Sequence, residues 1–306
     1  MAGLTTGGVA ATRRAQARLG LALVAPAVVL VGTFFLFPLG SAVYYSLTSW
    51  DGAPGAAPFV GLANYTEMLH DPEMWHALLN NGIWVVIGTV APLVIGLVLA
   101  VLLWSGARGA VFYRLLFFFP RVLPGVVIGI VWGWIYDPIN GWLNRMLEAV
   151  GLGALTRGWL GDPSVALYAV LFAAIWATFG FVVVIFLAAL QNVDIELVDA
   201  ARLDGANALQ RLWHVILPQI TPVFLMVTTL TLVGGISVFD IVFIMTGGGP
   251  GNATEVLGIY SFESAFQLNR IGYGTTLALL ITVLSVPFVV IINRLQRRLA
   301  LNETGV

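Results

Sequence analysis

Six long apolar segments run through this 306-residue chain, and they decide what it can fold into. Each has the length of about 20 residues or more that a helix needs to cross the hydrocarbon core of a membrane. Only 9% of the residues are charged, whereas soluble domains carry about 25%. We therefore expect an all-α polytopic membrane protein with six transmembrane helices. The predicted spans are Leu21–Tyr44, Ile83–Trp104, Leu115–Tyr136, Val165–Leu190, Ile220–Met245 and Gly274–Ile292.

Prolines lie in or beside most of these spans. Proline removes a backbone donor and clashes with the preceding turn, so the helices are expected to be kinked and to surround a cavity. Asn80 and Asn81 precede the second span and are predicted to cap it. The prolines are Pro26, Pro38, Pro92, Pro120, Pro124, Pro222 and Pro287.

The distribution of arginine predicts how the spans are oriented. Most arginines fall on one side of the predicted topology, and by the positive-inside rule this side is cytoplasmic. Only Arg145, Arg157 and Arg270 fall on the other side. We therefore expect a cytoplasmic tail at residues 1–18, one membrane domain over 19–293, and a cytoplasmic tail at 294–306. The cytoplasmic set is Arg13, Arg14, Arg18, Arg108, Arg114, Arg202, Arg211, Arg294, Arg297 and Arg298.

Several kinds of chemistry are excluded by composition. The chain has no cysteine, which removes disulfides and thiolate ligands. All of its basic residues are arginine, and a Walker A ATPase site needs a lysine. His70, His76 and His214 lack the spacing of metal ligands, and no arrangement of catalytic residues is evident. We expect no enzyme activity, no metal, no cofactor bound by this chain and no nucleic-acid partner, so energy must come from elsewhere.

A polar hairpin at 191–218 interrupts the apolar sequence on the predicted cytoplasmic side. Asp194 is placed to cap a first helix, and Gly205 to end it in a left-handed conformation. A second helix has an apolar stripe, and it ends before Pro218. Its other face offers Gln210, Arg211 and His214. The apolar stripe consists of Leu209, Leu212, Trp213, Ile216 and Leu217.

Two interpretations of the hairpin stay open on these grounds. It is either an amphipathic connector that lies on its own membrane domain or an element that docks to another protein. The small residues around Gly205 would let a partner's backbone approach closely. The carboxylates of Asp199 and Asp204 would be able to pair with a partner's arginines.

The hairpin resembles the EAA loop of the membrane subunits of binding-protein-dependent ABC importers. That pattern is Glu-Ala-Ala, three residues, Gly, nine residues and Ile-x-Leu-Pro. Here it is Asp199-Ala200-Ala201, then Gly205, then Val215-Ile216-Leu217-Pro218. Aspartate thus replaces glutamate, valine replaces isoleucine, and Asp194 stands where a proline often precedes the motif.

Outer segments extend this resemblance to the carbohydrate (maltose or glycerol-phosphate) branch of the family. They are 59–65, 137–144, 159–163 and the set Phe239-Asp240, Thr246–Pro250, Thr254, Tyr260 and Ala265-Phe266. The resemblance implies the ABC importer permease fold with cytoplasmic coupling helices, in a prokaryotic cell membrane. It implies four kinds of partner: a second permease, a dimer of ATPases that use ATP and Mg²⁺, an extracytoplasmic solute-binding protein and a sugar substrate. It also implies ATPase coupling by Asp199, Ala200, Ala201, Asp204, Gly205, Arg211, Leu217 and Pro218.

Polar and aromatic residues inside the spans are candidates for a substrate pathway. Arg121 either faces a cavity or extends to the inner membrane surface. Asp240 is expected to tie the Gly247–Pro250 turn more than to contact substrate. Trp132, Trp176 and Phe179 fit the core or an aromatic belt better than a sugar site. A secondary transporter driven by protons or sodium remains the alternative, although few titratable groups lie in the spans and no inverted repeat is visible.

Overall fold

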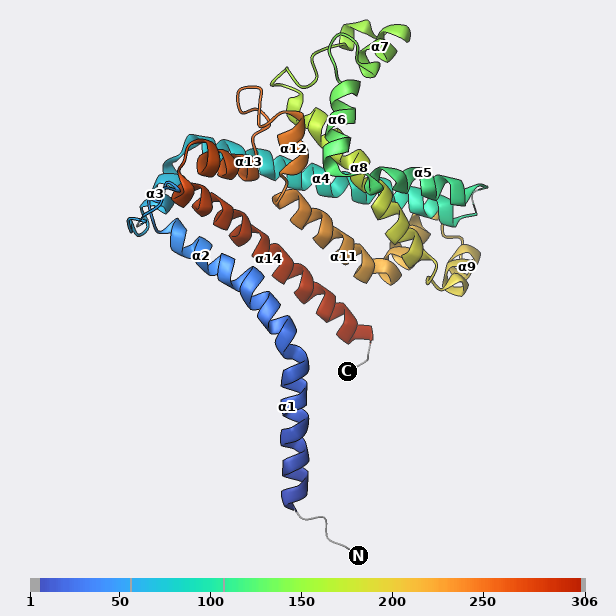
Figure 1. Ribbon diagram of the computed structural model, residues 1–306. Coiled ribbons are helices and arrows are strands. Elements are labelled where there is room, and N and C mark those ends of the chain that lie inside the picture. Colours follow the sequence, from blue (N-terminus) through green and yellow to red (C-terminus); the bar gives the residue numbers. More distant parts are fainter. Residues whose placement is uncertain (1–5, 56, 107, 304–306) are drawn as a thin grey trace, which may run out of the picture.

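The computed structural model describes residues 6–55, 57–106 and 108–303, and Figure 1 shows that this part of the chain is built from helices. Two of the helices run for 33 residues, and both belong to the expected spans. The elements are α1 (Thr6–Val31), a π-helical turn (Gly32–Leu36), α2 (Phe37–Ser46), α3 (Ala63–His70), α4 (Pro72–Trp104), α5 (Ala110–Val122), α6 (Gly125–Ile135), α7 (Trp142–Ala149), a 3-10 turn (Gly153–Leu155), α8 (Ala166–Leu190), α9 (Ile195–Leu203), α10 (Ala208–Arg211), a π-helical turn (Leu212–Ile216), α11 (Leu217–Ile236), α12 (Asp240–Met245), α13 (Leu257–Phe262), a π-helical turn (Glu263–Gln267) and α14 (Ile271–Glu303).

Five helices are long and apolar enough to cross a membrane, and a bent pair of helices makes a sixth candidate span. The chain is thus an all-helical membrane protein, as its apolar segments predict. Helix α1 starts at Thr6, so residues 6–18 of the expected tail are helical. Helix α14 likewise continues to Glu303, through most of the other expected tail.

The third predicted span is not one continuous helix. Helices α5 and α6 are bent by 101° at a short break. Pro124 has no N–H to donate and pushes the residue before it out of the helical conformation, and Leu123 is extended with ψ 136°. The prediction of a single helix over 115–136 was therefore wrong at this break.

The fifth predicted span also ends early. Helix α11 stops at Ile236, and α12 starts as a separate short helix at Asp240. The paired glycines Gly234 and Gly235 have low helix propensity, which favours an end here. The span that fits a membrane runs over Ala208–Ile236 and thus includes the second helix of the hairpin.

Asn80 and Asn81 do not cap α4, because that helix begins at Pro72 with Asp71 as its cap. Both amides are buried inside the molecule instead. The Nδ2 of Asn80 donates to the carbonyl of Glu255 at 2.8 Å, and the Nδ2 of Asn81 donates to Ile236 at 3.0 Å. The prediction that this pair of asparagines caps a helix was thus wrong, because both side chains bind backbone carbonyls far away in the sequence.

The core lies along α4, α8 and α11, which pack on one another lengthwise. Glycines permit the closest approaches, since a Cβ on Gly96 of α4 would lie 2.5 Å from Val182 of α8. Helix α2 packs on α14 and not on this core, and the apolar span Leu19–Ser46 contributes almost nothing to the interior. Figure 1 shows α1 extending away from the other helices, so its apolar face is left for lipid or another protein.

Candidate functional site

The hairpin at 191–218 has the helix–turn–helix form that its sequence predicts. The carboxylate of Asp194 accepts a hydrogen bond from the N–H of Glu196 at 2.9 Å and starts α9. At the other end, the N–H of Ala206 donates to Ala201 at 3.0 Å and that of Gly205 to Arg202 at 3.2 Å. This pair of bonds is a Schellman end, and it needs the left-handed φ of +84° at Gly205.

The turn after Gly205 is closed by side chains of the hairpin itself. Asn207 and Gln210 form a reciprocal capping box at the start of α10. The guanidinium of Arg211 donates to the carbonyl of Ala206 at 2.7 Å. Gln210 and Arg211, predicted to lie on a free polar face, thus build the turn.

The base of the hairpin is fixed to the spans. Ile216 is buried, and Leu212 and Leu217 pack with it against the core cluster that contains Phe186 and Leu190. The amide side chain of Gln219 accepts the N–H of Asp194 at 2.9 Å, which joins the start of α9 to α11. The base of the hairpin is therefore packed on the membrane domain.

The tip of the hairpin exposes both apolar and acidic side chains. Leu203 is 89% exposed, and Leu209 and Trp213 are 63% and 61% exposed. The predicted apolar stripe is thus divided between residues that pack on the core and residues that face outward. Asp199 and Asp204 are exposed, and within the described residues the one ion pair joins Arg270 to Glu67 instead.

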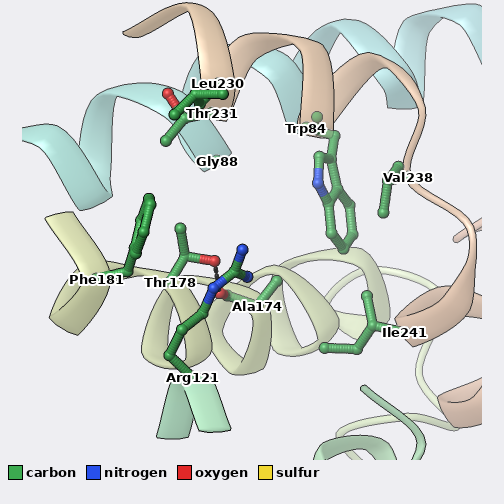
Figure 2. Close-up of a pocket in the computed structure, with 12 residues that line it drawn as sticks. Trp84, Gly88, Arg121, Ala174, Thr178, Phe181, Leu230, Thr231, Val238 and Ile241 are labelled. Atoms are coloured by element: carbon green, nitrogen blue, oxygen red, sulfur yellow. Dashed lines mark hydrogen bonds between the residues drawn. The ribbon is translucent and has the colours of Figure 1, made fainter. Parts of the chain in front are cut away.

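A second polar feature is a cavity between the spans, which has two adjoining chambers of about 240 Å³ and about 330 Å³. Figure 2 shows the first chamber, with Arg121, Thr178 and Phe181 on one side and Trp84 and Thr231 across from them. The second chamber adds Ser237 and Asp240. The two share Arg121, Ala174, Thr178, Gly234, Val238 and Ile241.

Both charged residues of the cavity come from breaks in helices. Arg121 lies in the last turn of α5, next to the 101° bend, and its guanidinium carbon lies 5.1 Å from the centre of the Phe181 ring. Asp240 opens α12 directly after the end of α11. Irregular backbone at membrane depth is tolerated where it lines a cavity, and this cavity accounts for both breaks. Arg121 thus faces a cavity, one of the two alternatives that the sequence left open.

Asp240 does not tie the turn at Gly247–Pro250, because the described residues show no hydrogen bond between them. Thr254 performs that role: its hydroxyl donates to the carbonyl of Gly249 at 2.8 Å and meets the hydroxyl of Thr246 at 2.7 Å. The sequence interpretation of Asp240 was wrong because the hydroxyl pair satisfies the turn locally. The carboxylate is left for the cavity.

The three aromatic candidates lie apart from the cavity. Trp132 is buried, and its ring centre is 5.6 Å from that of Trp176. Trp176 and the cavity residue Thr178 are two positions apart on α8, which places them about 200° around the helix. Phe179 packs against Phe117 of α5. The cavity residues Thr178 and Thr231 were missed, although hydroxyls within apolar spans are a usable signal.

The chain as a whole has relatives among known proteins. The family model described as "Binding-protein-dependent transport system inner membrane component" matches residues 93–301. The probable ABC transporter permease protein YurN of Bacillus subtilis is 37% identical over 254 residues, which cover 82% of this chain and 87% of YurN. The multiple sugar-binding transport system permease protein MsmF of Streptococcus mutans is 32% identical over 262 residues, which cover 86% and 89% of the two chains.

The fold has a counterpart among solved structures. A chain of a bacterial alginate ABC transporter, crystallised in complex with an alginate pentasaccharide-bound periplasmic protein, superposes with a TM-score of 0.81. The two chains are 18% identical, and the superposition covers 94% of this chain and 96% of the other. At this identity the likeness concerns the fold alone.

Proposed function

Since this chain belongs to the inner membrane components of binding-protein-dependent transport systems, the permease subunits of ABC importers, we propose that it forms one part of the membrane pathway of an ATP-driven sugar importer. The chain is the permease and not the ATPase subunit of such a system. It spans the membrane several times. We propose that this membrane is a prokaryotic cell membrane, with both termini and the hairpin in the cytoplasm.

The proposed role of the hairpin is to receive the ATPase. Its exposed leucines and tryptophan offer an apolar contact, and Asp199 and Asp204 offer charges to a partner's arginines. Its fixed base would carry a displacement at the tip into the spans. The residues proposed for this coupling are Asp199, Ala200, Ala201, Asp204, Gly205, Arg211, Leu217 and Pro218.

The proposed substrate pathway is the two-chambered cavity. Arg121 offers donors, Asp240 offers acceptors, and hydroxyls and the rings of Trp84 and Phe181 line the rest. A polyhydroxylated ring suits such a lining, because its hydroxyls need both donors and acceptors while its C–H faces pack on aromatic rings. Relatives named for multiple sugars, trehalose and maltose, and sulfoquinovosyl glycerol support a carbohydrate. Trp132, Trp176 and Phe179 are left outside this pathway.

The proposed assembly contains a second homologous permease, two copies of a cytoplasmic ATPase that bind ATP and Mg²⁺, and an extracytoplasmic solute-binding protein. A partner permease would cover the apolar surfaces that this chain leaves exposed, such as the outer face of α5. The family description names dependence on a binding protein, which supports the last partner.

The observation that carries the proposal is a hairpin, with a packed base and an apolar and acidic tip, on the same helix that lines the cavity. To test it, the chain and the products of its neighbouring genes are purified through a tag on the ATPase and reconstituted into vesicles. Labelled sugars are then offered with the binding protein. ATP-dependent uptake and retention of this chain are expected. Uptake that survives without the ATPase and collapses with an uncoupler would overturn the proposal.

A further inference from the structure

Glu255 is an acid buried where no basic group balances it. It lies in the segment 246–256 between α12 and α13 and is 2% exposed. Its Oε2 accepts no hydrogen bond within the described residues. An ionised carboxylate is disfavoured in such a place, because its buried Oε2 has lost water without gaining a donor.

The backbone around Glu255 is fastened to α4 by side chains. Asn80 donates to the carbonyls of Glu255 at 2.8 Å and Ala253 at 3.3 Å. The Oδ1 of Asn81 accepts the N–H of Leu257 at 2.7 Å, and the ring of His76 meets the carbonyl of Asn252 at 3.0 Å. The Glu255 side chain is thus held inside as long as the segment stays on α4.

The charged groups that act on Glu255 are all acidic. Asp71 and Glu73 lie at the start of α4, and Glu263 follows α13. The hydroxyls of Tyr260 and Tyr273 both donate hydrogen bonds to the carboxylate of Asp71, so neither serves as a donor to Glu255. Within the described residues, α8 brings no charge to this region, and Asp240 of α12 faces the cavity.

Burial first, and then the negative charges of Glu263, Glu73 and Asp71, raise the pKa of Glu255 from 4.5 to about 7. His76 is the one histidine on α4, which carries no arginine or lysine. Its ring forms hydrogen bonds with the carbonyl of Asn252 and the side-chain amide of Asn80. The buried position therefore favours the neutral acid.

We propose that Glu255 is a proton-binding site, and that the bound proton keeps the segment 246–256 attached to α4. The segment continues directly from α12, which carries Asp240 and Ile241 of the cavity wall. Loss of the proton would therefore free α12 to move at that end of the cavity. The chain would thus respond to pH at the side of the molecule away from the hairpin.

The direction of the pH effect follows from linkage. Glu255 binds the proton more tightly when the segment is attached than when it is released. Attachment is therefore strongest below pH 4.5, the ordinary pKa of a glutamate, and it weakens as pH rises. The weakening levels off above about 7, where Glu255 is ionised in both states. With a pKa of 4.5 in the released segment and about 7 in the attached one, the equilibrium constant for release increases about 20-fold between about pH 5.5 and pH 7.5.

A thiol placed beside Glu255 can measure this release. The chain has no cysteine, and Val256 is fully buried, so Val256→Cys gives a single thiol that reacts only when the segment opens. The full-length protein, extracted from its own membranes in detergent, is labelled with a maleimide at several pH values. The rate is divided by that of V256C/E255Q at the same pH, which cancels the chemistry of the thiol. This ratio is expected to rise about 20-fold from pH 5.5 to pH 7.5.

Matched variants make the outcome decisive. Glu148→Gln removes an exposed carboxylate on α7 and should leave the rise unchanged. Glu263→Gln removes one of the repelling charges, so the rise should become smaller. If E255Q does not fold, the rate of V256C is divided by that of V256C/E263Q instead, and this ratio should still rise with pH. A ratio that stays constant with pH would overturn the proposal. Neither sugar nor ATPase takes part, so that result would leave the proposed transport function untouched.

Discussion

The hairpin and the cavity are built in opposite ways. Every contact that shapes the turn of the hairpin joins residues within 194–219, from the Asp194 cap to the Arg211–Ala206 hydrogen bond. The cavity collects its lining from α4, α5, α6, α8, α11 and α12, and its two charged residues are more than 100 positions apart in the sequence. A local element can keep its shape while its surroundings move, whereas the cavity must change when any of its helices moves.

This difference separates the expected phenotypes of variants. Changes in the hairpin should affect the attachment of the ATPase and leave the cavity intact. Changes in the cavity should affect substrate handling and leave the assembly intact. Two measurements, retention of the ATPase and sugar uptake, therefore distinguish the two regions.

The largest effect is expected for Gly205→Pro. Proline fixes φ near about −65° and removes the N–H that Gly205 donates to Arg202, at a cost of about 3 kcal/mol. The population of correctly formed hairpins should fall about 100-fold, and both ATPase retention and uptake should be lost.

Gly205→Ala is the graded control for this change. No atom lies within 4 Å of an added Cβ at this position, so the strain of φ +84° acts alone. It should cost about 1–2 kcal/mol. If both variants retained the ATPase as well as the native chain does, the proposal that the turn at Gly205 shapes the docking site would be contradicted.

Leu203→Glu should have the next largest effect. Leu203 is the most exposed of the apolar tip residues, and burial of a leucine in a partner is worth about 1.5–3 kcal/mol. Retention of the ATPase in a pull-down should fall about tenfold or more. Leu152→Glu makes the same exchange at an exposed site outside the hairpin, and the native level of retention is expected there.

Arg121→Gln should lower uptake with the ATPase still bound. The variant keeps donors but loses the charge and the contact with Phe181, and a decrease of about tenfold at low sugar concentration is expected. Initial rates of uptake across a range of sugar concentrations measure it. Loss of the ATPase from the purified complex would show instead that the two regions cannot be separated.

The smallest functional effect is expected for Asp71→Asn, which tests the stability of the far side. Burial alone would raise the pKa of Asp71, but the hydroxyls of Tyr260 and Tyr273 outweigh it and hold this pKa below 3.8. The stabilisation is therefore complete above that value and is lost as pH falls through the lowered pKa. At pH 7 the variant should lower the free energy of unfolding by about 1–3 kcal/mol, which is measured as a lower thermal midpoint. Sugar uptake at a temperature where the variant is folded should change little. The native midpoint at pH 7 would contradict this role.

Sequence patterns predicted the hairpin better than the cavity for a physical reason. A cap, a glycine stop and a capping box act within one helical turn, so Asp194 and Gly205 were interpreted correctly from their neighbours alone. The number and approximate position of the spans also follow from composition. Asn80 and Asn81 looked like caps because their true partners, the carbonyls of Ile236 and Glu255, are more than 150 positions away.

The breaks in the third and fifth spans show the same limit. Hydropathy does not reveal a 101° bend, since the residues on both sides of Pro124 are mainly apolar. The charge of Arg121 was visible in the sequence, but its place in the cavity that Trp84 and Asp240 also line depends on how α5 and α12 approach the other helices. The signal that would have helped is the coincidence of a charged residue with a proline or glycine pair inside an apolar run.

The helical run from Ala208 to Ile236 joins the hairpin to the cavity wall in one span, so a tilt at one end displaces the other. Its 29 residues measure about 43 Å at about 1.5 Å per residue. A tilt of only about 5° about one end would therefore shift the other end by about 4 Å. Because the helix ends at Ile236, this displacement ends at the cavity wall and reaches α12 only through residues 237–239.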